Sequence, residues 1–231
     1  MPQTARRLPS YLLERYRAWH ALHYEENRSW YKRLVQDGQH PRTMMVTCCD
    51  SRFDPVGVFS AEPGEHFIVR NVASLIPPFV PGGGHHGTLA ALEFAVTVLH
   101  VAHIVIVGHS HCGGVKACHD MCSGAAPELL ENTSFVGRWM DILRPGYDRV
   151  SASIENDGTD AAQDRALRAL EQEAVLVSLR NLETFPFVRE AVEDGLLTLH
   201  GAWIDIASGK LHLFDPDKRR FAAIEGDRIG A

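Results

Sequence analysis

The sequence predicts an α/β fold in which a largely parallel β-sheet is flanked by helices and preceded by an N-terminal helical arm. Three observations lead to this prediction. Short apolar runs rich in valine and isoleucine recur at 43–48, 65–70 and 103–108. Stretches with helical spacing separate or follow these runs, as in buried parallel strands joined by crossover helices. A further helical pattern, at 10–36, precedes all of them.

The arm is predicted from its periodicity. Apolar and aromatic side chains recur there every three or four residues among charged ones, which is typical of an amphipathic helix. Gly38 and Pro41 end the pattern. We therefore expect residues 1–38 to form a helical arm within a single domain that spans 1–231.

The rest of the chain alternates between strand and helix patterns. The later predicted elements are a helix at 87–100 that packs on the sheet, a polar connection or helix start at 144–160, a helix at 161–185, and two strands within 196–215 that meet at an "ASGK" turn.

The overall composition fits one globular domain and argues against several partners. A chain of 231 residues that is 45% hydrophobic can bury a core. Its formal net charge of −6 offers no basic surface for a nucleic acid. Its longest apolar runs are too short to cross a bilayer, and its first residues lack the apolar core of a secretion signal. We therefore expect a cytoplasmic protein without nucleic-acid or membrane partners.

Its cysteines point to reduced thiols. The chain has five cysteines, an odd number, which does not fit a complete disulfide framework. Thiols of this kind are available as metal ligands or nucleophiles, and a redox dithiol is disfavoured because no Cys-x-x-Cys pair is present.

The first chemical motif, "CCDSR", lies at the end of the run at 43–48. Because side chains alternate along a strand, Cys48, Asp50 and Arg52 are expected to share one side and face one cavity. Cys49 would then point the other way, and we expect it to be a buried residue, since free cysteine behaves as a small hydrophobe.

The second motif, "GHSHCGG", follows the run at 103–108. His109 lies directly after that strand, and Cys112 lies just before a Gly-Gly entry into a helix, whose N-terminus should lower the pKa of the thiol. Two thiolates and one imidazole suit Zn²⁺ and leave one coordination position for water. From spacing alone, an alternative stays open: buried thiols, a hydrogen-bonded core histidine, and an ordinary ion pair between Asp50 and Arg52.

These motifs resemble those of the β-class carbonic anhydrases, in particular the plant-like branch. "CCDSR" matches the family's Cys-x-Asp-Ser-Arg element and "HSHC" matches its His-x-x-Cys element, with "PGEHFIVRNVAS" between them and "LTLHGAWIDIASGKL" after them. The resemblance implies that Cys48, His109 and Cys112 bind Zn²⁺. It also implies that Asp50 and Arg52 form a catalytic dyad.

The resemblance further implies reversible hydration of carbon dioxide to bicarbonate and a proton. It places Gln39, Phe67, Val72 and Phe94 at substrate-binding positions. Members of this family form homodimers or larger homo-oligomers with the active cleft at the subunit boundary, so part of the pocket is expected to come from a partner copy.

Some positions depart from other branches of the family. The bicarbonate-inhibited branch has a tryptophan and a tyrosine where this chain has Met45 and Ile204. The regulatory bicarbonate site is therefore expected to be absent, although its third member, Arg70, is present.

Two expectations about chemistry follow from the ligand set. Two thiolates cancel the formal charge of Zn²⁺, so the metal should be a weaker Lewis acid than with three histidines, and activity should rise into the alkaline range. Proton export needs a relay, for which the candidates are His40, His85, His86 and His111.

Two alternatives keep this site and change its use. The first is hydrolysis of carbon disulfide or carbonyl sulfide on the same scaffold. The second is a non-catalytic zinc or bicarbonate-sensing module, in which Asp50 takes the last position on the metal.

Overall fold

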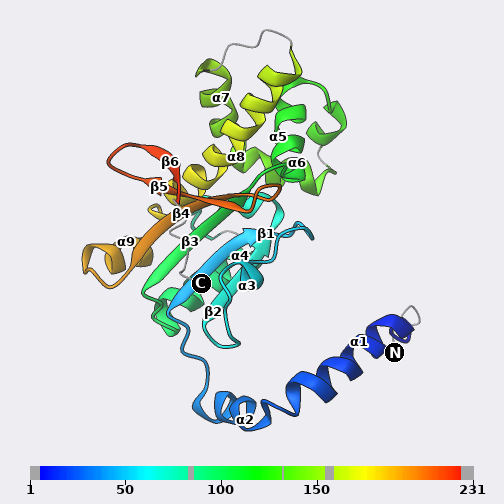
Figure 1. Ribbon diagram of the computed structural model, residues 1–231. Coiled ribbons are helices and arrows are strands. Elements are labelled where there is room, and N and C mark those ends of the chain that lie inside the picture. Colours follow the sequence, from blue (N-terminus) through cyan, green and yellow to red (C-terminus); the bar gives the residue numbers. More distant parts are fainter. Residues whose placement is uncertain (1–5, 83–85, 132, 154–158, 225–231) are drawn as a thin grey trace. The chain divides into compact units, whose positions relative to one another are not determined.

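The computed structural model describes residues 6–82, 86–131, 133–153 and 159–224. The chain falls into two compact units, Met1–His40 and Pro41–Ala231. The described part of the first unit is helical, and the second unit contains the sheet (Figure 1).

The first unit confirms the predicted helical arm. It consists of helix α1 (Ser10–Trp19), a π-helical turn (His20–Tyr24) and helix α2 (Arg28–Asp37). None of these three segments contains a buried residue. Helix α2 ends where Gly38 adopts a φ of +77°, a conformation that favours glycine.

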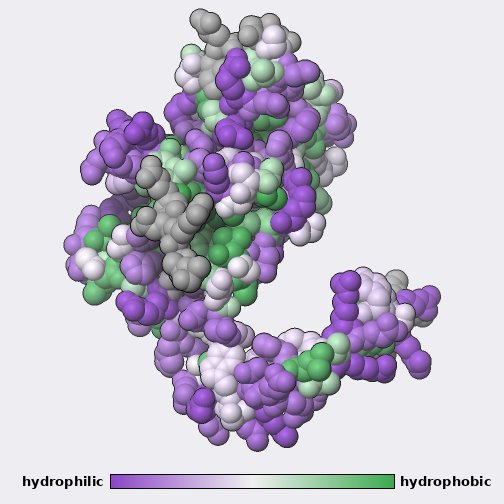
Figure 2. All heavy atoms as spheres, in the orientation of Figure 1, coloured by the Kyte–Doolittle hydropathy of each residue, from purple (hydrophilic) through white to green (hydrophobic). Residues whose placement is uncertain are grey.

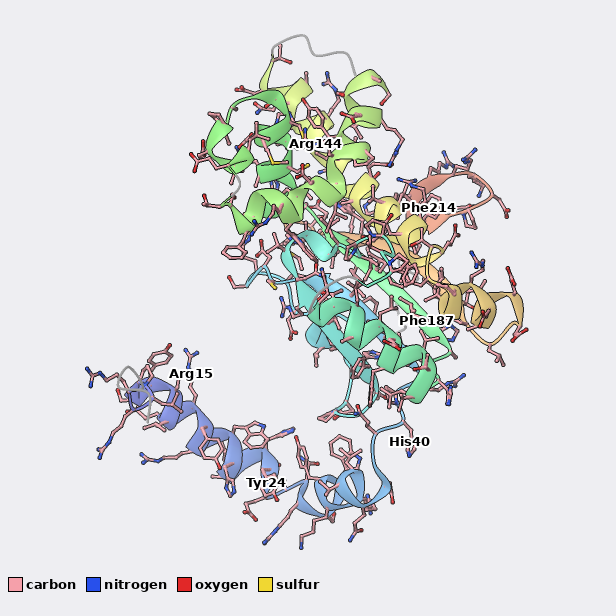
Figure 3. The ribbon with its side chains drawn as sticks, turned by 180° about the vertical axis from the view of Figure 1, so that it is seen from behind. Arg15, Tyr24, His40, Arg144, Phe187 and Phe214 are labelled. Atoms are coloured by element: carbon pink, nitrogen blue, oxygen red, sulfur yellow. The ribbon has the colours of Figure 1, made fainter. Side chains whose placement is uncertain are left out.

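Aromatic rings of the arm pack on one another, as Trp19 does on Tyr24 and Tyr31, but no residue of its three helical segments is fully buried. Trp19 is 43% exposed and Leu22 is 70% exposed. Apolar residues can be seen on the arm in Figure 2, and the side chains around Tyr24 in Figure 3 stand out from the helices. Within the described part of this unit, the apolar side chains of the arm therefore stay partly exposed.

The second unit is built on a sheet of six strands in the order β2-β1-β3-β4-β5-β6. The first four strands in this order are parallel and the last two pairings are antiparallel. The strands are β1 (Thr43–Cys48), β2 (His66–Asn71), β3 (His103–His109), β4 (Thr198–Asp205), β5 (Lys210–Asp215) and β6 (Arg220–Ala223). The prediction of a largely parallel sheet is confirmed.

The helices of the second unit follow the strands. They are α3 (Pro55–Val58), α4 (Gly87–Glu93), α5 (Gly113–Ser123), α6 (Phe135–Met140), α7 (Arg144–Ser153), α8 (Asp160–Leu182) and α9 (Pro186–Glu193). Helix α4 continues as a π-helical segment, Phe94–Val98. The predicted helices at 87–100 and 161–185 correspond to α4 with its extension and to α8, and the polar stretch from 144 begins with α7.

Side chains that alternate along the central strands belong to different apolar clusters on the two faces of the sheet. Ile104 and Ile106 of β3 pack with residues of α4, α8 and α9, whereas Val107 packs with Phe53, Ala202 and other residues on the opposite side. A further cluster joins α5, α6, α7 and α8, which lie together in Figure 1, and it includes Cys48 and Cys112. The two cysteine ligand candidates are thus part of a packed core.

Candidate metal centre

The predicted ligands meet where two neighbouring strands end. Cys48 is the last residue of β1 and His109 is the last residue of β3. The two strands are parallel and adjacent, with Thr47 level with Val107, so their carboxyl ends lie at one edge of the sheet. Cys112 is the N-cap residue of α5, which brings its thiol back to the same edge.

The three side chains form a compact, buried group. The Sγ atoms of Cys48 and Cys112 are 3.8 Å apart, and all the potential ligand atoms of this group lie within 4.8 Å of one another. Relative exposure is 5% for Cys48, 1% for His109 and 3% for Cys112. Among the described residues, Cys48, His109 and Cys112 form the one group of three or more cysteine, histidine or acidic side chains whose ligand atoms are close enough to bind a single metal ion.

The donor set fits a zinc ion. The Nδ1–H of His109 donates to the carbonyl of Ser110 over 2.9 Å, which leaves the lone pair of Nε2 free to bind a metal. This buried Nε2 has no hydrogen-bond partner within the described structure, and such an orphaned atom is costly unless it binds something. A tetrahedral ion with Zn–S bonds of about 2.3 Å places its sulfur ligands roughly 3.8 Å apart, which matches the separation of the two thiols.

The two buried thiols influence each other's ionisation. The pKa of Cys48 is lowered chiefly by the Cys112 thiol, 3.8 Å from its sulfur, and further by the nearby His109 ring, although burial acts in the opposite direction. The pKa of Cys112 is raised because its hydrogen bond to Cys48, burial and the charge on Cys48 all favour the protonated form. Backbone N–H groups at the start of α5 lower the pKa of Cys112 but are outweighed. The helix N-terminus thus acts on the pKa of Cys112 in the predicted direction, and the neighbouring Cys48 sulfur and burial oppose it.

The predicted dyad is formed next to these ligands. The Nε of Arg52 donates to Oδ1 of Asp50 over 2.9 Å, and its Nη2 donates to Oδ2 over 2.7 Å. These hydrogen bonds hold the pKa of the Asp50 carboxyl well below its ordinary value. Oδ2 of Asp50 is 4.0 Å from Nε2 of His109, so an ionised carboxylate lies beside the ligand group. Arg52 also donates to the carbonyl of His111 over 2.8 Å, which ties the two motifs together.

The local reason for this pairing differs from the predicted one. Strand β1 ends at Cys48, and the chain turns at Ser51 and Arg52, so strand alternation does not continue to Arg52. Instead the backbone N–H of Arg52 donates to Oδ1 of Asp50 over 2.9 Å, which closes a tight turn. The prediction that Cys49 is buried is wrong, because this residue lies past the strand and is exposed.

The predicted substrate-binding residues are not all brought together within one chain. Val72 is 39% exposed and lies against the start of α5, since a Cβ on Gly114 would come within 2.6 Å of its side chain. Phe67 and Phe94 lie together, with ring centroids 6.0 Å apart. Phe67 is level with Met44 on β1, four residues before the end of that strand and so roughly 13 Å from it.

Gln39 and His40 belong to the arm unit, which is described by itself. Two other relay candidates lie on the second unit. His111 is exposed, and the ring of His86 stacks on Trp139 at a centroid distance of 5.5 Å. Trp139 in turn donates its indole N–H to the carbonyl of Val72 over 2.7 Å, so His86 is linked to the start of α5. The fourth candidate, His85, lies outside the described residues.

Sequence reasoning missed one buried acid behind the metal ligands. Glu171 on α8 is 5% exposed and accepts the backbone N–H of Cys112 over 3.2 Å. Burial raises its pKa. Its spacing in the sequence could have indicated that it is buried, because Glu171 shares a helix face with the buried Val175, Ser178 and Leu182.

A second missed contact secures the loop after His109. The hydroxyl of Ser110 donates to Asp205 over 3.0 Å and accepts the backbone N–H of Ile206 over 2.9 Å. These bonds connect the metal-ligand loop to the end of β4. No short motif reveals this contact, because Ser110 and Asp205 are far apart in sequence.

Comparisons with known proteins agree with this geometry. A family model described as carbonic anhydrase matches residues 43–211. Beta carbonic anhydrase 3 of Arabidopsis thaliana is 37% identical over 194 residues, which cover 84% of this chain and 72% of that protein.

Solved structures of the same class have a similar fold. The β-carbonic anhydrase CcaA matches with a TM-score of 0.81 and 28% identity, over 94% of this chain and 92% of that chain. A tetrameric β-carbonic anhydrase from Sordaria macrospora matches with a TM-score of 0.73 over 94% of this chain and 98% of that chain, and at 24% identity this is a likeness of fold.

No helix among the described residues is both long and apolar enough to span a membrane.

Proposed function

This chain belongs to the β-class of the carbonic anhydrase family, a class of zinc lyases, and we propose that it catalyses the reversible hydration of carbon dioxide to bicarbonate and a proton. The observation that supports this most directly is the buried Cys48–His109–Cys112 group beside an ionised Asp50. A set of only three protein ligands is typical of catalytic zinc, which keeps a position open for solvent or substrate.

The ligands and the dyad divide the work in this proposal. Cys48, His109 and Cys112 would hold Zn²⁺, and when bound the ion lowers the pKa of a coordinated water, so that a nucleophile is available near neutral pH. Asp50 accepts a hydrogen bond from the attacking water and orients its lone pair towards carbon dioxide. Arg52 keeps Asp50 ionised and holds both carboxylate oxygens, so that this side chain stays on the arginine.

The contacts of Asp50 favour an enzyme over a closed structural site. Both of its carboxylate oxygens accept hydrogen bonds from Arg52, and Asp50 is not part of the three-residue group with metal-binding geometry. A module in which Asp50 completes the coordination of the metal would have to break two charge-assisted hydrogen bonds.

We further propose that a second copy of the chain completes the substrate pocket. Phe94 is 40% exposed and lies with Phe67 away from the ligand end of β1, so both can serve a neighbouring site. Val72 would line the pocket from the chain that supplies the metal ligands, and Gln39 would come from the arm. The exposed apolar side chains of the arm give a second copy a surface to cover.

The oligomer can be tested on the arm itself. Leu22→Asp should shift the protein towards the monomer in light scattering and lower its activity. Gln36→Asp, an exposed polar position on the same arm, is the matched control and should leave both unchanged. A Leu22→Asp variant that keeps the wild-type mass would show that the arm does not mediate assembly.

The route of the proton can be tested by buffer dependence. The second unit contains two described candidates for the proton relay, His86 and His111. Of these, His86 has a ring that is held by stacking on Trp139. We propose His86 as the relay, so His86→Asn should lower kcat at low buffer concentration, with recovery in added imidazole, and leave kcat/KM unchanged. A loss of kcat in His111→Asn, but not in His86→Asn, would assign the relay to His111.

The main test combines metal analysis with rapid kinetics. The purified protein should contain one zinc ion per chain and hydrate carbon dioxide in a stopped-flow assay, with a rate that rises between about pH 7 and pH 9. Sulfide release from carbon disulfide or carbonyl sulfide, without hydration of carbon dioxide, would assign the scaffold to the other substrates. A zinc-loaded protein inactive on all three would overturn the enzymatic proposal.

A further inference from the structure

Arg70 makes an unusual set of contacts next to the metal centre. It lies near the end of β2, level with Thr47 on β1. Its side chain reaches past the end of β1 and donates three hydrogen bonds, all to backbone carbonyls. Nε donates to Cys48 over 2.9 Å, and Nη2 donates to Asp50 over 2.8 Å and to Phe53 over 2.7 Å.

The three carbonyls belong to one short segment, residues 48–53, which carries a metal ligand and both members of the dyad. Carbonyl oxygens that converge on one point repel one another, so this backbone path needs a positive group at its centre. The guanidinium supplies the charge and donors in a fixed plane, which the flexible ammonium of a lysine cannot reproduce. Arg70 thus holds three carbonyls of one short segment at a single guanidinium group.

The far end of the segment touches another metal ligand. Phe53 is 3% exposed, and its ring stacks on His109 with a centroid distance of 6.2 Å and an interplanar angle of 21°. Segment 48–53 thus begins at one ligand and ends against another. A change in its backbone path would move the thiol of Cys48, the carboxylate of Asp50 and the packing of His109 together.

We propose that Arg70 is a positioning residue for the hydration reaction, one that acts by clamping the backbone of segment 48–53. This inference rests on the proposed function. Arg52 and Arg70 have different tasks: Arg52 binds the carboxylate of Asp50, whereas Arg70 fixes the peptide from which that carboxylate projects. Without the clamp, the carboxylate and the Cys48 thiol no longer keep their places relative to His109.

The test compares Arg70→Lys with a matched control, Arg144→Lys. Arg144, which Figure 3 labels, is the first residue of α7 and forms an ion pair with Asp141. It does not contact the metal ligands or the dyad. Arg70→Lys should keep one zinc ion per chain but lose kcat roughly tenfold to a hundredfold, with a much smaller change in KM, because small misplacements of reacting groups are costly. The control should keep wild-type values.

A second measurement does not depend on catalysis. Amide hydrogen exchange should be roughly tenfold or more faster in segment 48–53 of Arg70→Lys than in wild type, both before and after zinc loading, while the strands β3 and β4 keep their protection. A purely stabilising role would lower the melting temperature and leave both kcat and the exchange pattern of this segment unchanged. That result would overturn the inference.

The wild-type protein provides the test should Arg70→Lys not fold. The Nε–H of Arg70, which donates to Cys48, should exchange slowly with solvent in a nuclear magnetic resonance experiment, and rapid exchange would overturn the clamp. A wild-type protein without hydration activity would instead overturn the proposed function. A hydrating wild type together with a fully active Arg70→Lys variant would overturn only this inference.

Discussion

The two ends of strand β3 each carry side chains that can bind metals, yet the two groups of side chains differ in every other respect. At the carboxyl end, His109 meets two thiols whose sulfur atoms are 3.8 Å apart. At the amino end, Nδ1 of His103 is 3.2 Å from Nε2 of His200 on β4. The ligand atoms of each group are close enough to share one ion, so proximity alone does not separate a metal site from a hydrogen bond.

Burial and a third ligand make the difference. The thiols and His109 are buried, and Nε2 of His109 has no partner within the described structure, so this end gains most from a cation. His200 is exposed, and one ring of the histidine pair can donate its N–H to the other. In the part of the chain that the structure describes, no third ligand joins the histidines with metal-binding geometry.

The strongest test of this comparison is to remove one thiol. Cys48→Ser should lose bound zinc and lower hydration activity by roughly a thousandfold, because in the proposed reaction the ion activates the water that attacks carbon dioxide. Metal analysis and stopped-flow kinetics measure both effects. Cys49→Ser is the matched control, since its side chain is adjacent in sequence but exposed, and it should keep both zinc and activity. Equal losses in the two variants would contradict the assignment of Cys48.

The charges that surround the ligands should matter almost as much. Arg52→Ala should reduce kcat/KM by roughly a hundredfold while zinc content stays full, because Asp50 loses the partner that aims it. Zinc analysis beside kinetics separates this result from damage to the metal site. Arg144→Ala removes a surface arginine as a control. Zinc lost together with activity in Arg52→Ala would mean that the arginine supports metal binding.

The carboxyl end of the sheet was largely predictable because its signals are local. β1 runs over Thr43–Cys48 as predicted, and β3 extends one residue past the predicted 103–108, since β-branched apolar runs specify buried parallel strands. Parallel strands that end at one edge also bring Cys48 and His109 together by topology. The resemblance of two short motifs to a known family then identified the ligand set and the dyad.

The errors and omissions come from contacts that local patterns do not encode. Alternation fails at Cys49 because the strand has ended, so nothing covers this side chain. The hydrogen bonds of Glu171 and Arg70 to the ligand segments depend on how distant elements pack, and a single sequence does not give that packing. Phe67 and Phe94 pack on each other away from the ligand end of β1, so their predicted grouping with the other substrate-binding residues depends on the second copy proposed above.

The histidine pair gives a third, smaller test. Wild-type protein should bind one zinc ion tightly, and any second ion should bind at least about a hundredfold more weakly, because two imidazoles without a third ligand among the described residues form an incomplete site. Titration by calorimetry measures both affinities. His103→Asn should remove the weak binding and leave the tight ion in place. Two equally tight ions in wild type, one of them lost in His103→Asn, would show that the amino end of β3 is a true metal site.

The smallest effect concerns stability at mildly acidic pH. Burial, together with the neighbouring His103, lowers the pKa of His200 below its ordinary 6.5. As the pH falls through 6.5, the unfolded chain therefore takes up a proton before the folded chain does, and stability is lost in this range. His200→Asn should remove this loss, so its melting temperature should fall less than that of wild type between about pH 7.5 and pH 5.5, by only about 1–2 °C because the ring is only partly shielded from solvent. His103→Asn should remove only part of the loss, since burial of His200 would remain. Calorimetry measures the melting temperatures, and an equal fall in all three proteins would mean that the histidine pair does not contribute to acid sensitivity. The contrast between the two ends of β3 would then rest on metal binding alone.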